Sequence, residues 1–422
     1  MMMTVFLAIA IRATNPVHMK VVITRLCYIF NSVSQKVIAH ADLDRLNTYI
    51  VETMCQLEMC FPPSFFDMQV HLMVHLVDQI KTLGPLYLHH MFPYERYLSV
   101  LKGYVRNRAH PEGSIMEGYT TEEVIEFCAD YVKDGKRIGL PVPPHEGKLS
   151  GSGRVGRNTF IAEDYKIIQE VHFSVLQQLV IAEPYVMEHL SSLRRENQGP
   201  QEDWIMKQHR EHFVAWLMDK DIPYGDSTEE RTMKMLASGP SRQVTRWQAY
   251  DINGYTFHTE EKDKKSVGQN SGVRIEALDP HGHNTTYYGV VQDIWELDYG
   301  PRMRIPVFKC QWVKHPNGVT VDNYGLTVVN LRNVGHKNEP WVLADRVAQV
   351  FYVPDPSNPE KHVVVSAKQR IVGVEDVGDD GEDYNQYDEM TLFTDPENIS
   401  HIEATNDFKN IMPYMRRHSG TG

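Results

Sequence analysis

The sequence lacks the features that define several large protein classes. Its 422 residues include only five scattered cysteines, too few for a disulfide framework, which favours a reducing compartment. No run of apolar residues approaches the roughly 18 that a transmembrane helix needs. Walker loops, dinucleotide-binding glycine motifs and the G-x-S-x-G nucleophile motif are also missing. We therefore expect neither a membrane protein nor a hydrolase or nucleotide-binding enzyme of these types.

An overall excess of positive charge is missing too. The net charge is −12 and is spread unevenly along the chain. Lys and Arg minus Asp and Glu gives +3 for residues 1–110, −8 for 111–240, +2 for 241–370 and −9 for 371–422. A negative total does not exclude nucleic-acid binding, because local basic surfaces decide that property.

The first part of the chain has a helical pattern. Apolar residues at steps of three and four predict helices over about 43–59, 67–81 and 93–106. A capping box from Thr120 to Glu123 predicts the start of a fourth helix, which ends near Gly135. The apolar run Thr4–Ile11 has no basic residue before it, so we interpret it as helix and not as a signal peptide.

The second part changes to a strand pattern. Five short segments are rich in Val, Tyr, Phe and Trp and are separated by Gly, Pro and Asn turns, which predicts a small antiparallel barrel or sandwich. They are Tyr287–Leu297, Ile305–Val313, Leu326–Leu331, Val347–Val353 and His362–Ser366.

Together these patterns predict an α+β protein. It has an N-terminal all-helical region, a C-terminal small antiparallel β-barrel-like module and a disordered acidic tail. A Gly/Pro-rich stretch predicts a linker, and Pro184 separates two further helices, at about 161–183 and 203–219. The expected parts are a helical domain 1–138, a linker 139–160, a helical extension 161–240, a β-rich module 241–370 and the tail 371–422.

The predicted helix at 93–106 carries the first candidate site. Glu95, Ser99, Lys102 and Arg106 share one helical stripe, and Arg96 and Arg108 lie beside it. The opposite face, expected to point inward, contains Tyr97, Leu98, Leu101 and Tyr104. An acid at the head of a row of cations could hold a divalent metal while the cations hold a phosphate backbone. The same stripe is also typical of a solvated helix face with internal charge pairing.

A pair of histidines is the second candidate. His71 and His75 are four residues apart on a predicted helix, so both rings could reach one zinc ion, and Asp78 could orient one of them. Zinc would need two more ligands; Cys55 and Cys60 precede the pair but are expected on a helix and not on a zinc knuckle. The alternative is two histidines at the edge of the core, satisfied by hydrogen bonds.

Two weaker signals remain. His209 and His212 are three residues apart and are interpreted as the flank of the helix that carries Trp204, Phe213 and Trp216. The many aromatic residues of the β module could form a surface for stacking peptides or bases, although such residues are more often core.

Long phrases of the sequence resemble a known family. The blocks LEMCFPPSFFDMQVHLMVHL and FPYERYLSVLKGYVRNRAHPEGSIMEGYTTEEVIEFC resemble a plant domain of unknown function that follows the transposase core of CACTA (En/Spm-type) DNA transposons. The blocks RWQAYDINGYTFHTEEKDKKSVGQNSGVRIEA and YYGVVQDIWELDYGPRMRIPVFKCQWV resemble a second such domain, found C-terminal to the first. The resemblance covers roughly residues 5–355.

The resemblance implies cut-and-paste DNA transposition by an RNase H-like DDE core. Such enzymes hold two Mg²⁺ ions with two or three carboxylates, which activate water or a 3′-hydroxyl against a phosphodiester. The family's last acid is a helical glutamate after a zinc-binding histidine pair. This implies the third-acid role for Glu95, with Glu112 and Glu117 as rivals, and the zinc role for His71 and His75.

The sequence departs from the family at the two catalytic aspartates, which belong on β-strands before this region. Here Asp42, Asp44, Asp67 and Asp78 are expected on helices or turns. We therefore expect the C-terminal helices of an RNase H-like transposase without its sheet, inactive alone, with Mg²⁺ relevant only if it is joined to a complete catalytic core.

Three functional hypotheses follow. The first is a truncated CACTA-type transposase in the nucleus that binds transposon DNA ends or a full-length transposase through Arg96, Lys102, Arg106 and Arg108. The second is a domesticated, non-catalytic nuclear protein whose β module contacts peptide or chromatin. The third is a metal-dependent DNA nuclease built around Glu95. No small-molecule substrate and no membrane partner is indicated.

Overall fold

The chain is described in a computed structural model that covers two long stretches. They are residues 5–131 without 16, 36, 87, 88 and 90, and residues 153–367 without 197–201, 221, 223–227, 279–281 and 301–302, together with Phe393. Contacts divide the chain into an N-terminal helical unit and a second unit spanning Gly147–Asn398. Residues 139–152 of the predicted linker and the predicted tail, apart from Phe393, lie outside the described residues.

The N-terminal unit is helical, as the sequence predicted. Its first helices are α1 (Leu7–Ala10), α2 (Val17–Val33), α3 (Leu43–Cys60), α4 (Met68–Leu72) and α5 (Leu76–Leu83). The predicted apolar stripe of α3 is confirmed, because Leu43, Leu46, Ile50 and Leu57 are buried. They form one core with apolar residues of α2 and α5. One buried cation joins α2 to α3: Arg25 donates hydrogen bonds to Thr53 and Glu52 and lies over the Tyr49 ring.

Two further helices, α6 (Phe92–Gly103) and α7 (Pro111–Tyr131), differ from the prediction at their ends. α6 stops three residues before Arg106. α7 starts at Pro111, nine residues before the expected capping box, because proline suits the first turn of a helix. Thr120 and Glu123 therefore lie inside α7, where the hydroxyl of the neighbouring Thr121 donates to the Glu117 carbonyl.

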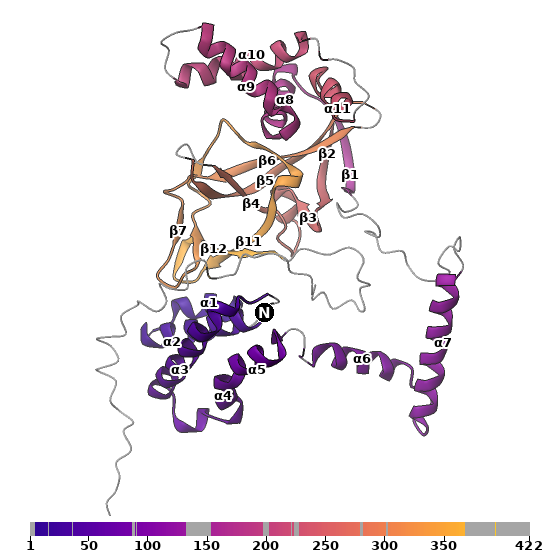
Figure 1. Ribbon diagram of the computed structural model, residues 1–422, viewed down its shortest axis with the longest axis vertical. Helices are drawn as coiled ribbons and strands as arrows, with labels where there is room; N and C mark the ends of the chain where they lie inside the picture. Colours follow the sequence, from indigo (N-terminus) through magenta and orange to yellow (C-terminus); the bar gives the residue numbers. More distant parts are fainter. Residues whose placement is uncertain are drawn as a thin grey trace, which may run out of the picture. The chain divides into compact units, whose positions relative to one another are not determined.

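The second unit contains an antiparallel sheet, which confirms the predicted C-terminal β region (Figure 1). The main path runs in the order β1-β2-β5-β4-β11-β12-β8-β7, while β3, β6, β9 and β10 branch from it. Its described strands are β1 (Gly153–Ala162), β2 (Gln243–Ile252), β3 (Tyr255–His258), β4 (Gly272–Leu278), β5 (Asn284–Asp298), β6 (Arg304–Val313), β7 (Val319–Val321), β8 (Thr327–Val329), β9 (Val334–Gly335), β10 (Trp341–Leu343), β11 (Ala348–Asp355) and β12 (Asn358–Ser366).

Local sequence explains the first hairpin of the sheet. β2 and β3 are joined by Asn253 and Gly254, which both have positive φ, 51° and 73°. Two central residues of this kind form the tight turn that matches the twist of paired strands. The following segment contains the one-turn helix α12 (Glu260–Asp263).

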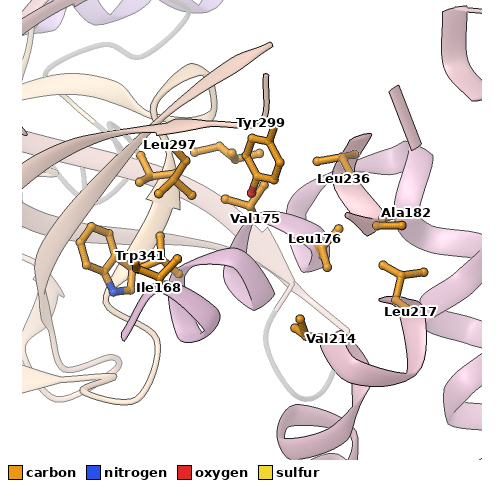
Figure 2. Packing of buried hydrophobic residues seen from close by; sticks show 14 of the residues in the cluster. Ile168, Val175, Leu176, Ala182, Val214, Leu217, Leu236, Leu297, Tyr299 and Trp341 are labelled. Atoms are coloured by element: carbon orange, nitrogen blue, oxygen red, sulfur yellow. The ribbon is translucent and has the colours of Figure 1, made fainter. Parts of the chain in front are cut away.

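Four longer helices belong to the same unit. They are α8 (Tyr165–Gln178), α9 (Glu183–Glu196), α10 (Glu202–Asp219) and α11 (Thr228–Ala237). Of these, α8 is the one that packs directly on strand β10. Figure 2 shows Val175 and Leu176 of α8 and Leu217 of α10 in the same cluster as Leu297, Tyr299 and Trp341 of the sheet. The segment expected as a separate helical extension therefore shares a core with the β module.

Two boundaries in this unit differ from the prediction. Pro184, expected as a break, is the second residue of α9, where its missing N–H costs nothing. β1 begins at Gly153, inside the stretch expected as linker, and pairs with β2 from Gly153 to Ala162 with one irregularity after Val155. Glycine-rich composition favours a linker, but pairing with a neighbouring strand outweighs that local preference.

The Gln178 side chain bonds α8 directly to the sheet. Its amide nitrogen donates to the Trp341 carbonyl at 3.1 Å, and its amide oxygen accepts the Leu343 N–H at 2.9 Å. Both partners are backbone groups of β10. One side chain thus bonds to β10 as a neighbouring strand would.

Candidate functional site

Glu95, the predicted last acid of a catalytic triad, lies in the first turn of α6. Its side chain is exposed. The candidate aspartates lie on helical segments or a helix cap: Asp42 ends a 3₁₀ turn, Asp44 is on α3, Asp67 caps α4 and Asp78 is on α5. In the described part of the chain, no three His, Cys, Asp or Glu side chains form a group that could hold a metal ion.

The predicted cations lie around the end of α6. Lys102 is in its last turn, whereas Arg106 and Arg108 follow the helix, so the predicted stripe does not extend to Arg106. The helix ends here because the Tyr104 and Val105 N–H groups turn back to Leu101 and Lys102. Lys102, Arg106 and Arg108 are exposed; Arg96 lies within α6.

The turn that carries the two arginines is held by side chains. The Asn107 N–H donates to the Ser114 hydroxyl at 3.1 Å, and the Ala109 N–H donates to the Asn107 side chain at 3.0 Å. The first bond ties the turn to Ser114 in the first part of α7, and the second holds the turn itself. The corner between α6 and α7 therefore presents Arg106 and Arg108 on a backbone of defined shape.

The rival acids Glu112 and Glu117 lie on α7, and both are exposed. Glu112 is 3.7 Å from the ring of His110. Since His110 stands just before the helix, this contact is local. It gives Glu112 no link to the other candidate acids.

The two candidate zinc ligands are close together but are not on one regular helix. His71 is on α4, and His75 ends the 3₁₀ segment Met73–His75. Their rings are 5.2 Å apart, edge to face, and both side chains are exposed. Cys55 is exposed on α3, and Cys60 is the last residue of that helix. The histidine pair, His71 and His75, could supply two zinc ligands.

Most aromatic residues of the β module are core. Tyr288, Trp295, Tyr299, Trp312, Trp341 and Tyr352 are all buried. Tyr287 is partly exposed. Its ring centroid lies 5.6 Å from that of His315 and 5.2 Å from that of His336. The described strands therefore use their aromatics mainly for packing.

A buried histidine cluster escaped the sequence interpretation. His209, expected on a helix flank, is fully buried, and its Nδ1 atom lies 2.8 Å from Nδ1 of His189 on α9. The Gln177 amide nitrogen lies 2.9 Å from Nε2 of His209. If that amide donates, His209 carries its proton on Nδ1 and donates to His189. Both rings must then be neutral, which agrees with their lowered pKa values, chiefly a result of burial.

A second buried histidine connects a helix to the sheet. Nδ1 of His172 on α8 lies 2.8 Å from the Tyr299 hydroxyl, while its Nε2 is buried without a hydrogen-bond partner. Burial lowers the pKa of His172 to about 4. This polar contact belongs to the packing between α8 and the sheet. The helical periodicity of apolar residues does not predict it, because a polar side chain takes the buried position.

None of the helices in the described residues has the length and apolar character needed to cross a membrane.

Comparison with known proteins finds two family matches. Residues 33–138, which include α3 to α7, match a domain of unknown function (DUF4218). Residues 295–365, from the end of β5 to β12, match another domain of unknown function (DUF4216). No curated protein and no solved structure matches the chain. The expected pair of domains of unknown function is thus present, one matching the helical unit and the other the sheet.

Proposed function

We propose that the chain is a part of a CACTA-type DNA transposase that binds the DNA backbone and does not cut DNA by itself. Two lines support the transposase origin: the resemblance of long sequence phrases and the order of the two matched domains. Transposon DNA, or a full-length transposase bound to it, is the proposed partner, which places the protein in the nucleus.

The cations at the α6–α7 corner carry the proposal of DNA binding. Lys102, Arg106 and Arg108 lie within seven residues, and all three are exposed. The adjacent N-terminus of α7, a helix of 21 residues, adds partial positive charge from its unpaired N–H groups. Phosphate groups of a DNA strand are the ligand that such an arrangement suits.

The proposal assigns no cutting because Glu95 belongs to no group of candidate metal ligands among the residues that the structure describes. Two-metal catalysis uses at least two carboxylates on one pair of ions. Within the described residues, no group of three candidate ligands forms around any acid. Mg²⁺ would therefore matter only in an assembly with a complete catalytic core. Zinc at His71 and His75 stays a proposal that requires further ligands, since structural zinc sites use four.

DNA binding can be measured by fluorescence anisotropy with duplex DNA at 50–200 mM KCl. Three phosphate contacts predict a slope of about −2.7 in log K against log salt, a loss of about 40-fold in affinity over this range. We expect Arg106→Ala to make the slope less steep by about 0.9. Arg45→Ala, at an exposed arginine 3.2 Å from Asp42, is the matched control and should leave the slope unchanged.

Binding that is absent, independent of salt or equally weakened in both variants contradicts the proposed DNA contact. Cutting is tested separately by plasmid nicking in Mg²⁺. The wild-type chain should leave the plasmid intact. Nicking that disappears in Glu95→Gln would instead support the metal-dependent nuclease.

A further inference from the structure

Helices α6 and α7 expose an unusual number of large apolar side chains. They include Tyr94 and Leu98 of α6, 63% and 57% exposed, and Met116 and Phe127 of α7, 65% and 72% exposed. Tyr97, which was expected to point inward, is also 46% exposed. The predicted inward face of α6 is thus wrong for Tyr97 and Leu98. Large apolar side chains exposed in this number on two neighbouring helices mark a surface that binds another macromolecule.

The two helices are fixed to each other where they cross. Tyr104 lies against Gly118, where an added Cβ would stand 2.7 Å from the tyrosine ring. Tyr97 of α6 also interacts with Tyr119 of α7. Figure 1 shows α6 and α7 running crosswise. The exposed apolar residues therefore lie on a corner of defined shape, which we call the α6–α7 surface.

The α6–α7 surface has two halves of opposite charge. Residues 92–110 contain four Lys or Arg and one Glu, whereas residues 111–131 contain six Asp or Glu and no Lys or Arg. Lys102 on α6 and Glu122 and Glu123 on α7 are exposed members of these halves. An occupant of the whole surface must therefore offer an acidic apolar part and a basic apolar part together.

We propose that a second copy of this chain covers the α6–α7 surface, with α6 of each copy packed on α7 of the other. In a two-fold symmetric dimer each contact occurs twice, so both basic halves meet acidic halves. The acidic residues of α7 beyond its first turn would repel DNA along most of that helix, and a basic peptide would satisfy α7 alone. A second copy supplies both parts. Lys102 then faces α7 of the other copy, so in the dimer Arg106 and Arg108, which follow α6, keep the proposed role toward DNA, and the expected salt slope falls to about −1.8.

The oligomeric state of the full chain tests the apolar contact. We expect a concentration-dependent dimer in sedimentation equilibrium, weakened at least tenfold by Leu98→Ser combined with Phe127→Ser. Both side chains are exposed, so circular dichroism should be unchanged. Met187→Ser, at a methionine of α9 that is 56% exposed, is the matched control and should dimerise like the wild type. A wild-type chain that is monomeric at every concentration overturns the proposal.

Charge reversal tests the pairing of the halves. One variant combines Arg96→Glu with Lys102→Glu; the other combines Glu122→Lys with Glu123→Lys. The first variant has net negative charge on both halves and should be monomeric, whereas the second lowers the charge of residues 111–131 from −6 to −2 and should dimerise more weakly than the wild type. An equimolar mixture, in which the introduced acids of α6 meet the introduced lysines of α7, should form a one-to-one heterodimer. A mixture that stays monomeric, or single variants that dimerise normally, contradicts the proposed pairing. The salt dependence of DNA binding in the Leu98→Ser, Phe127→Ser variant separates failure of this proposal from failure of the DNA contact.

Discussion

At the scale of single residues, the second unit contains histidines that burial keeps neutral. His172 and His209 are 1% and 0% exposed, and burial lowers the pKa of each to about 4. In the unfolded chain both side chains would titrate near 6.5. The folded and unfolded states therefore bind different numbers of protons over a window that begins just below neutral pH.

The direction of the pH effect follows from that difference. Between pH 6.5 and 4 the unfolded chain takes up protons that folded His172 does not, so acid favours unfolding. The part of the free energy of unfolding that depends on neutral His172 is fully present above pH 6.5 and is lost as the pH falls toward 4. For His172 this loss amounts to about 3 kcal/mol. Urea unfolding of the second unit at pH 7.5 and pH 5 should show about 2 kcal/mol of this loss, because pH 5 still lies above the pKa of folded His172.

A substitution assigns part of this sensitivity to one side chain. We expect His172→Phe to reduce the stability lost between pH 7.5 and pH 5, because phenylalanine cannot take up a proton in the unfolded chain. Tyr299→Phe removes the hydroxyl at 2.8 Å but keeps the histidine, so it should retain the acid sensitivity. The same pH dependence in His172→Phe as in the wild type would show that other groups control it.

At the scale of elements, the Gln178 amide is the contact that we expect to respond most strongly to truncation. Gln178→Ala leaves the Trp341 carbonyl and the Leu343 N–H without their partner. At the usual cost of unsatisfied buried groups, the free energy of unfolding should fall by about 2–4 kcal/mol. Ser174→Ala, one turn earlier on α8, removes only an exposed bond to the Glu170 carbonyl and should change stability by less than about 0.5 kcal/mol. Equal losses in the two variants would contradict this role of Gln178.

The elements also show what the sequence could predict. The stripe from Leu43 to Leu57 predicted α3 well, because helix period and burial coincide there. All five predicted strands are present, because their residues have a strong preference for β structure. Helix ends were harder to predict: the Thr120–Glu123 pattern is interior to α7, and α6 stops before Arg106, since neighbouring residues compete for the same backbone groups.

The candidate site was predictable in composition but not in geometry. The exposed cations after α6 were identified from their spacing, yet the turn that carries Arg106 and Arg108 depends on the contact between Asn107 and Ser114. His189 and His209 lie on two different helices and are twenty positions apart in the sequence, so no local pattern contains the pair. Which apolar face of α6 is buried depends on contacts between elements and not on the period itself.

At the scale of the whole molecule, the helices α8, α10 and α11 and the sheet fold as one body. Val244, Trp295, Leu297 and Leu343 of the sheet, with Tyr299 directly after β5, share a core with residues of these helices. A fragment of residues 153–367 should therefore unfold cooperatively. A fragment of residues 241–367, with that face uncovered, should lack near-ultraviolet circular dichroism and dispersed amide resonances. A well-folded 241–367 fragment would show that the sheet does not need its helical layer.

The bond between Gln178 and β10 has one more consequence. β10 pairs with β6 along one side, and the Gln178 amide occupies backbone groups on the other. An unoccupied strand edge is a template for association with strands of other chains. The helical layer therefore also protects this strand from edge-to-edge aggregation.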